Sequence, residues 1–240
     1  MKLNDLQAFY LYEKTKPNFL IGPVAELEFD LSPDILAKII YRFSADFGIT
    51  KDSSSNVLSW TSDLDSSYTL NYQSLSQAPS LSAVGGKPFV NFIFGDYLVF
   101  PKQADIYSWA AVYKYNSSSY ANFPMFADES TYQWHGDMST MAHSTFAGVN
   151  WKNALIYKDG SYINTAVHAI KHPSYQSVCA VLSSPMMASD SSRLGKDRIY
   201  PNGFVGDICE LITFSTYLSQ EEITEINRYF NAKWGEIIGL

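Results

Sequence analysis

Residues 120–137 gather aromatic rings, an imidazole and a carboxylate in a segment with almost no hydrophobic periodicity. Sugars present apolar C–H faces and rims of hydroxyl groups, so carbohydrate sites combine aromatic platforms with hydrogen-bonding side chains. Long irregular segments inside a compact domain are usually functional or interfacial. The alternative is that these rings cover the end of the core or pack against a neighbouring subunit. The candidate glycan-binding residues are Tyr120, Phe123, Tyr132, Trp134, His135 and Asp137.

Calcium is the candidate cofactor, because aspartate oxygens are the ligands that this hard cation prefers. It needs six to eight oxygen ligands, which several carboxylates must supply together. The candidate ligands are Asp63, Asp96 and Asp137, but the sequence contains no local D-x-D or EF-hand spacing around them. We therefore expect no firmly bound cofactor, with Ca²⁺ as the one metal to test.

Glu210 is a carboxylate within an apolar run, which suggests that its side chain is partly buried. A buried carboxylate is costly unless it is hydrogen-bonded or paired, so we expect backbone N–H groups or a Lys or Arg to satisfy it. The alternative is a catalytic role, since glycoside hydrolases use two carboxylates across the scissile bond. The E-x-D-x-x-E signature, the Gly-x-Ser-x-Gly elbow and nucleotide-binding loops are all absent from the sequence. We therefore expect a protein that is not an enzyme.

The elements that would position these groups are clearest near the C-terminus. Residues 207–214 predict a strand that is covered on both faces, with Ile208, Ile212 and Phe214 sharing a face with Glu210. Ser219 then begins an S-x-x-E capping box. The spacing of the apolar residues that follow predicts one helical face, and Gly235 is a stop signal. That face consists of Ile223, Ile226, Phe230 and Trp234.

These C-terminal blocks resemble the end of concanavalin A-like (laminin-G-like) domains. The similar motifs are Gly206-Asp207-Ile208-Cys209-Glu210, Leu218-Ser219-Gln220-Glu221 and Lys233-Trp234-Gly235, and further blocks follow in order from residue 33 onward. The resemblance implies an all-β fold: a two-sheet antiparallel jelly-roll β-sandwich with one C-terminal amphipathic helix. We expect this domain to span residues 32–240. Residues 1–31 do not match, and they form either an edge strand of the same domain or an assembly arm.

Composition narrows the class of partner. The formal net charge is −7 and no basic run occurs, which disfavours nucleic acid as a partner. No stretch approaches the length of a membrane helix, so we expect no membrane insertion. The start lacks the apolar core of a secretory signal, and we expect synthesis in a cytoplasm. Cys179 and Cys209 lie in apolar runs and are predicted to be buried free thiols rather than a disulfide.

Two functional hypotheses follow, because this architecture hosts binding, catalytic and structural proteins alike. Domains that this chain resembles recur in phage structural proteins and adhesins. We therefore expect a virion structural, decoration or fibre protein with a lectin-like sandwich that binds host-surface glycans. Its partners would be other virion proteins, further copies of itself and a surface polysaccharide. The alternatives are a free-standing carbohydrate-binding module, cytoplasmic or secreted by a non-classical route, and, third, a glycoside hydrolase.

Overall fold

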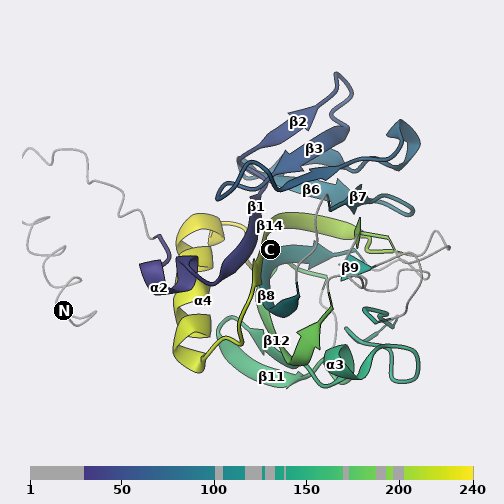
Figure 1. Ribbon diagram of the computed structural model, residues 1–240. Coiled ribbons are helices and arrows are strands. Elements are labelled where there is room, and N and C mark those ends of the chain that lie inside the picture. The colour runs from purple at the N-terminus through teal and green to yellow at the C-terminus, as the bar shows by residue number, and fades with distance from the viewer. Residues whose placement is uncertain are drawn as a thin grey trace, which may run out of the picture.

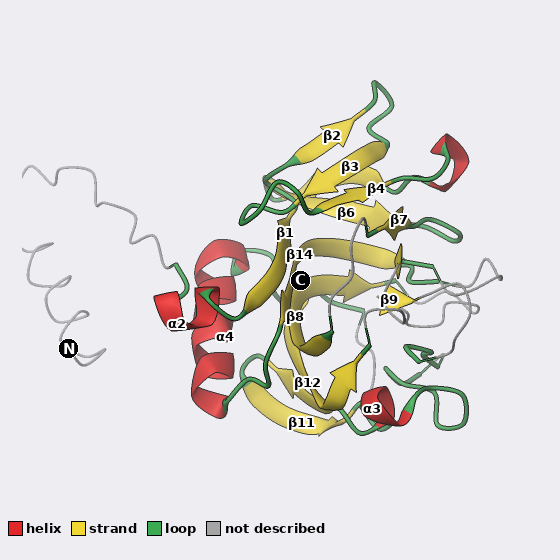
Figure 2. Cartoon of the chain, viewed as in Figure 1, coloured by secondary structure: helices red, strands yellow, loops and turns green. Residues whose placement is uncertain are grey.

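The structure, a computed structural model, shows a chain built mostly of strands. Within the described residues these strands form two antiparallel sheets, and one long helix lies near the C-terminus (Figure 2). This confirms the predicted all-β sandwich with a C-terminal helix. Residues 1–29 of the predicted N-terminal arm fall outside the described part. The structure describes residues 30–100, 105–116, 126–127, 133–137, 139–169, 173–187, 193–196 and 203–239.

The larger sheet has eight strands in the described part of the chain. Their order is β11-β10-β12-β8-β14-β6-β5, with β1 also paired to β14. The predicted turn at Asp159 and Gly160 joins β10 to β11, and both residues have positive φ angles. The strands are β1 (Ile39–Ser44), β5 (Ser80–Val84), β6 (Lys87–Phe92), β8 (Ile106–Tyr115), β10 (Leu155–Lys158), β11 (Ser161–Thr165), β12 (Gln176–Met186) and β14 (Gly206–Phe214).

The smaller sheet has six described strands in the order β2-β3-β4-β7-β13-β9. These are β2 (Ile49–Lys51), β3 (Val57–Thr61), β4 (Thr69–Asn71), β7 (Leu98–Val99), β13 (Arg193–Leu194) and β9 (Phe126–Ala127). The described helices are α2 (Pro33–Leu36), α3 (Val149–Lys152) and α4 (Gln220–Trp234), with a 3₁₀ turn, η1, at Leu75–Gln77.

Strand β14 is the centre of the larger sheet, and all of its residues are buried. Strand β8 pairs along one side of it. The other side is shared, because β6 pairs with residues 206–208 and β1 pairs with residues 210–214. One C-terminal strand therefore joins three strands that come from earlier parts of the chain.

Helix α4 covers the outer face of the larger sheet, and Figure 1 shows it beside β1 and α2. It begins with the predicted capping box: the Ser219 hydroxyl accepts from the Glu222 N–H, and the Glu222 carboxylate accepts from the Ser219 N–H. The four residues of the predicted apolar face are all buried. Local capping and an apolar stripe thus fix both the start of the helix and the side that faces the sheet.

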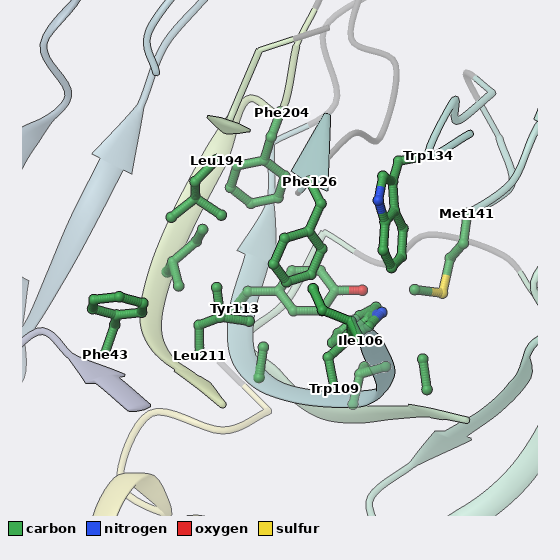
Figure 3. Close-up of a cluster of buried hydrophobic side chains, with 14 of the residues drawn as sticks. Phe43, Ile106, Trp109, Tyr113, Phe126, Trp134, Met141, Leu194, Phe204 and Leu211 are labelled. Carbon is green, nitrogen blue, oxygen red and sulfur yellow. The ribbon is translucent and has the colours of Figure 1, made fainter. Parts of the chain in front are cut away.

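The buried side chains form two clusters, one on each face of the larger sheet. The first fills the space between the sheets and is rich in aromatic rings, several of which appear in Figure 3. The second lies between the larger sheet and α4. Cys179 and Cys209 belong to this second cluster and are buried free thiols, which confirms that prediction.

Candidate functional site

The structure describes three of the six candidate glycan-binding residues. Tyr120, Phe123 and Tyr132 lie outside the described residues. Trp134, His135 and Asp137 follow the short strand β9 and precede α3. The position of each of these three side chains decides what it can contribute to binding.

Trp134 is part of the core. Its side chain is 3% exposed, and its ring centroid lies 4.9 Å from that of Phe126 and 5.4 Å from that of Trp151. Figure 3 shows the Trp134 ring beside Phe126 and Met141 in the cluster between the sheets. Protein side chains therefore fill the space around the Trp134 ring in which a sugar would have to stack. Trp134 supports the loop from inside.

The segments on either side of residue 140 run next to each other and are tied by backbone hydrogen bonds. The His143 N–H donates to the His135 carbonyl at 2.9 Å, and the Gly148 N–H donates to the Gln133 carbonyl at 3.0 Å. A Cβ at position 148 would lie 1.8 Å from the Gln133 amide oxygen, so the Gln133 side chain would have to move to admit one. These bonds tie residues 133–135 to residues 143–148.

Three rings meet on this loop: those of His135, His143 and Phe146. The centroids of His143 and Phe146 are 4.7 Å apart, those of the two histidines 5.4 Å, and those of His135 and Phe146 6.0 Å. Phe146 is 57% exposed, and the neighbouring Val149 is also exposed. We call His135, His143, Phe146 and Val149 the ring surface.

The ring surface combines apolar and polar groups within a pre-ordered loop. The His143 Nδ1 atom accepts from the N–H groups of Thr145 and Phe146 at 3.1 and 3.3 Å, which fixes the orientation of its ring. Asp137 is half-buried two residues after His135. An exposed phenylalanine ring beside two imidazole groups suits a ligand with C–H faces and hydroxyl groups.

Sequence reasoning included His135 in the candidate site but missed His143 and Phe146. A signal was present, because histidine and aromatic residues continue beyond residue 137. Only the backbone pairing of residues 133–135 with 143–148 shows that these later residues share a surface with His135.

The three candidate calcium ligands are not brought together. Among the described residues, no group of three or more His, Cys, Asp or Glu side chains could hold a metal ion. Both carboxylate oxygens of Asp63 lie 2.8 Å from Arg42 Nε. Asp96 is buried in the turn after β6, where it accepts from the Ile93 N–H at 2.9 Å. Burial raises the pKa of Asp96 to about 6, despite that hydrogen bond, which favours the charged form.

Glu210 faces α4, and the predicted grouping with Ile208 is wrong. The pairing of β14 with β8 shifts register between Ile208 and Glu210, which is a β-bulge. Ile208 packs between the sheets, whereas Cys209 and Ile212 pack toward α4. The extra residue makes Cys209 and Glu210 face the helix in succession, so the strict two-residue alternation fails here.

The Glu210 carboxylate is fully buried and is held by three side chains of α4. Tyr229 Oη donates to one oxygen at 2.6 Å, and Trp234 Nε1 donates to the other at 2.7 Å. The ammonium group of Lys233 lies 3.1 Å from the second oxygen. Burial raises the pKa of Glu210, and the nearby Lys233 charge opposes that rise. The structural expectation for Glu210, pairing with a basic residue, is met by Lys233.

Lys233 also connects Glu210 to Ser44. A serine hydroxyl beside a lysine amine resembles a nucleophile beside a base. Its ammonium lies 2.8 Å from the Ser44 hydroxyl and 3.4 Å from Asp46. Ser44 is fully buried, however, and Lys233 lies within ion-pair distance of both Asp46 and Glu210. A buried hydroxyl cannot meet a substrate. This cluster fastens α4 to β1 and β14.

In the described part of the chain, no helix is long and apolar enough to cross a membrane. Neither a protein-family model nor a curated protein matches this chain.

Proposed function

We propose that this chain is a non-catalytic structural domain that binds carbohydrate on the ring surface. The observation that carries the proposal is the meeting of His135, His143 and Phe146 on a loop that backbone hydrogen bonds hold in place. Aromatic side chains on surfaces are common where ligands with apolar faces bind. A pre-ordered loop also loses little conformational entropy when a ligand binds.

The packed core beneath the ring surface also favours a preformed binding site. Trp134 and Trp151 are both buried directly under the loop, and the Trp151 indole N–H donates to the Met141 carbonyl at 3.3 Å. A ligand bound to Phe146 would therefore rest on a packed sandwich.

We place this function in a virion, as a decoration or fibre domain that contacts host-surface glycans. The support is the resemblance of the C-terminal blocks to concanavalin A-like domains of phage structural proteins, together with the sandwich fold. An antibody against the chain that labels purified virus particles would support this setting. A chain that is found only outside particles would contradict it and leave a free-standing carbohydrate-binding module.

The test of the binding function is a glycan array with the full chain, followed by titration calorimetry on the best glycan. Phe146→Ala is expected to weaken binding about tenfold, which corresponds to about 1.4 kcal/mol. The matched control is Phe47→Ala, because Phe47 is 51% exposed on the β1–β2 turn, away from the ring surface. Both variants should keep the melting temperature of the parent. Equal weakening by the two variants, or an array without any bound glycan, would refute the proposal.

A further inference from the structure

A single helical turn carries Phe146 on the ring surface, and His143 begins that turn. The Ala147 N–H donates to the His143 carbonyl at 3.2 Å, which closes the turn. The His143 side chain caps it, because Nδ1 accepts from the N–H groups of Thr145 and Phe146 at 3.1 and 3.3 Å. The first N–H groups of a helical turn lack partners within it, and Asn, Asp or Ser side chains commonly supply them. Here an imidazole has that role.

This cap requires a neutral imidazole. One ring nitrogen of neutral histidine accepts a hydrogen bond, whereas both nitrogens of the imidazolium are donors. Uptake of a proton by His143 would therefore place a hydrogen on Nδ1, opposite the N–H groups of Thr145 and Phe146. Both hydrogen bonds would be lost, and three donors would face one another. Histidine side chains ordinarily take up a proton between pH 5 and 8.

The surroundings of the turn already include a cation. The ammonium of Lys152, in α3, donates to the Ser144 carbonyl at 3.4 Å. The turn after β11 also lies beside the loop, since its carbonyls accept from the N–H groups of residues 141 and 142. A protonated His143 would thus add a second positive charge to the same turn. Among the described residues, the titratable and charged groups on this loop and the segments bound to it are His135, Asp137, Lys152 and His168.

The effect of losing the cap would be local. The fold holds the end of the turn, because the Gly148 N–H donates to the Gln133 carbonyl at 3.0 Å. Residues 144–146 are exposed, and His143 caps the beginning of this stretch. Release of the cap would therefore move residues 144–146, including Phe146, and leave the rest of the loop in place.

The movement would change the ring on which a sugar would stack. Phe146 is 57% exposed, and its ring centroid lies 4.7 Å from that of His143. An imidazolium is also attracted by the face of an aromatic ring, so it would compete with a ligand for Phe146. Loss of the cap and this competition both act against binding.

We propose that protonation of His143 releases the turn of residues 143–147 and weakens glycan binding at the ring surface. The site then binds its ligand near neutral pH and releases it in mild acid. This inference rests on the proposed carbohydrate binding and adds a means of regulating it. His143 acts as a positioning residue, because it sets the place of Phe146 through the backbone.

The first measurement needs no glycan. The backbone amide NMR signals of Thr145 and Phe146 are followed in the full chain from pH 7.5 to 5.5, together with the His143 ring signals. In the parent, the amide signals are expected to shift with the midpoint of the His143 ring. In His143→Asn they should stay in place, because the Asn side-chain oxygen can accept the same bonds and does not titrate. Amide signals that ignore the titration of His143 would overturn the inference.

The second measurement is the affinity for the best glycan from the array, by titration calorimetry at pH 7.5 and 5.5. The parent should bind about tenfold more weakly at pH 5.5, which corresponds to about 1.4 kcal/mol. For His143→Asn the ratio of the two affinities should be about one. The matched control is His168→Asn, which removes an exposed histidine outside the ring surface and should keep the tenfold ratio.

The comparison with His143→Asn also separates His143 from other groups that titrate in this range. Burial raises the pKa of Asp96 to about 6, and that residue is the same in the parent and in the variant. A tenfold ratio that persists in His143→Asn would therefore refute the regulation. A glycan that the parent binds equally at both pH values would refute the regulation alone, whereas an array without any bound glycan would refute the proposed function as well. The remaining amide signals show whether each variant is folded.

Discussion

Replacing Lys233 by methionine tests how the buried carboxylate is stabilised. The substitution removes the ammonium 3.1 Å from Glu210 and keeps most of the aliphatic stem. Breaking a buried pair by removal of one partner costs about 3–5 kcal/mol. Lys233 is 25% exposed, and its contact with the more exposed Asp46 contributes little, so we expect the lower end, about 3 kcal/mol at pH 8.

The penalty should depend on pH. Burial raises the pKa of Glu210, so the folded chain holds a proton over a pH range in which the unfolded chain has released it. Stability contributed by this group therefore falls as pH rises through that range. Without the Lys233 charge the pKa of Glu210 rises further and the range extends upward. As pH falls through the raised pKa of Glu210, the carboxyl takes up a proton and no longer needs a cation. The penalty of Lys233→Met should therefore shrink at low pH toward about 1 kcal/mol, the value of a lost hydrogen bond.

The assay is urea unfolding followed by tryptophan fluorescence at pH 8 and pH 5, in the parent and in a Glu210→Gln background. The Gln side chain carries no charge, so Lys233→Met should cost only about 1 kcal/mol there at either pH. Lys51→Met serves as the control for loss of an exposed lysine. A penalty that is the same at both pH values, or the same in both backgrounds, would refute the conclusion that the Lys233 charge stabilises the ionised Glu210 carboxylate.

Three further substitutions or reagents test other parts of the fold. Ser219→Ala should remove the helix cap and lower the free energy of unfolding by about 1 kcal/mol in the same urea assay; no change would mean that the cap is not stabilising. Gly48→Ala should cost about 1–3 kcal/mol, because φ is +68° and a Cβ would lie 2.4 Å from the Thr61 carbonyl oxygen; a melting temperature equal to that of the parent would contradict this. Burial raises the pKa of Cys179 to about 12 and also raises the pKa of Cys209, so a thiol reagent at pH 8 should react with neither in the folded chain and with both in urea. Rapid reaction of the folded chain would show that these thiols are accessible.

The C-terminal helix could be predicted because its signals are local. The capping box at Ser219 and the apolar spacing from Ile223 to Trp234 lie within one short segment, and the structure confirms both. The same holds for the Asp159-Gly160 turn, whose residue types favour the positive φ angles that the hairpin needs.

The orientation of Glu210 could not be predicted from β14 alone. The bulge beside it depends on pairing with β8, which comes from a distant part of the sequence. A hint was present in α4, where Tyr229 and Lys233 are four residues apart and therefore lie on one helical side. Recognising them as partners of Glu210 requires knowing which side of α4 meets the strand.

The candidate glycan site could likewise be predicted only in part. Composition located the aromatic segment, but burial of Trp134 and exposure of Phe146 depend on tertiary packing. An aromatic residue serves equally well as core filling or as a binding surface, so its type alone does not distinguish these uses.

The central position of β14 has a consequence for how the chain folds during synthesis. Strands β1, β6 and β8 are made first, but each must pair with residues 206–214 to complete the larger sheet. Until those residues emerge from the ribosome, the nascent chain exposes unpaired strand edges, which are sites of aggregation. Contacts between such distant segments also form slowly. We therefore expect chains that stall before residue 206 to depend on chaperones and to be cleared by proteolysis.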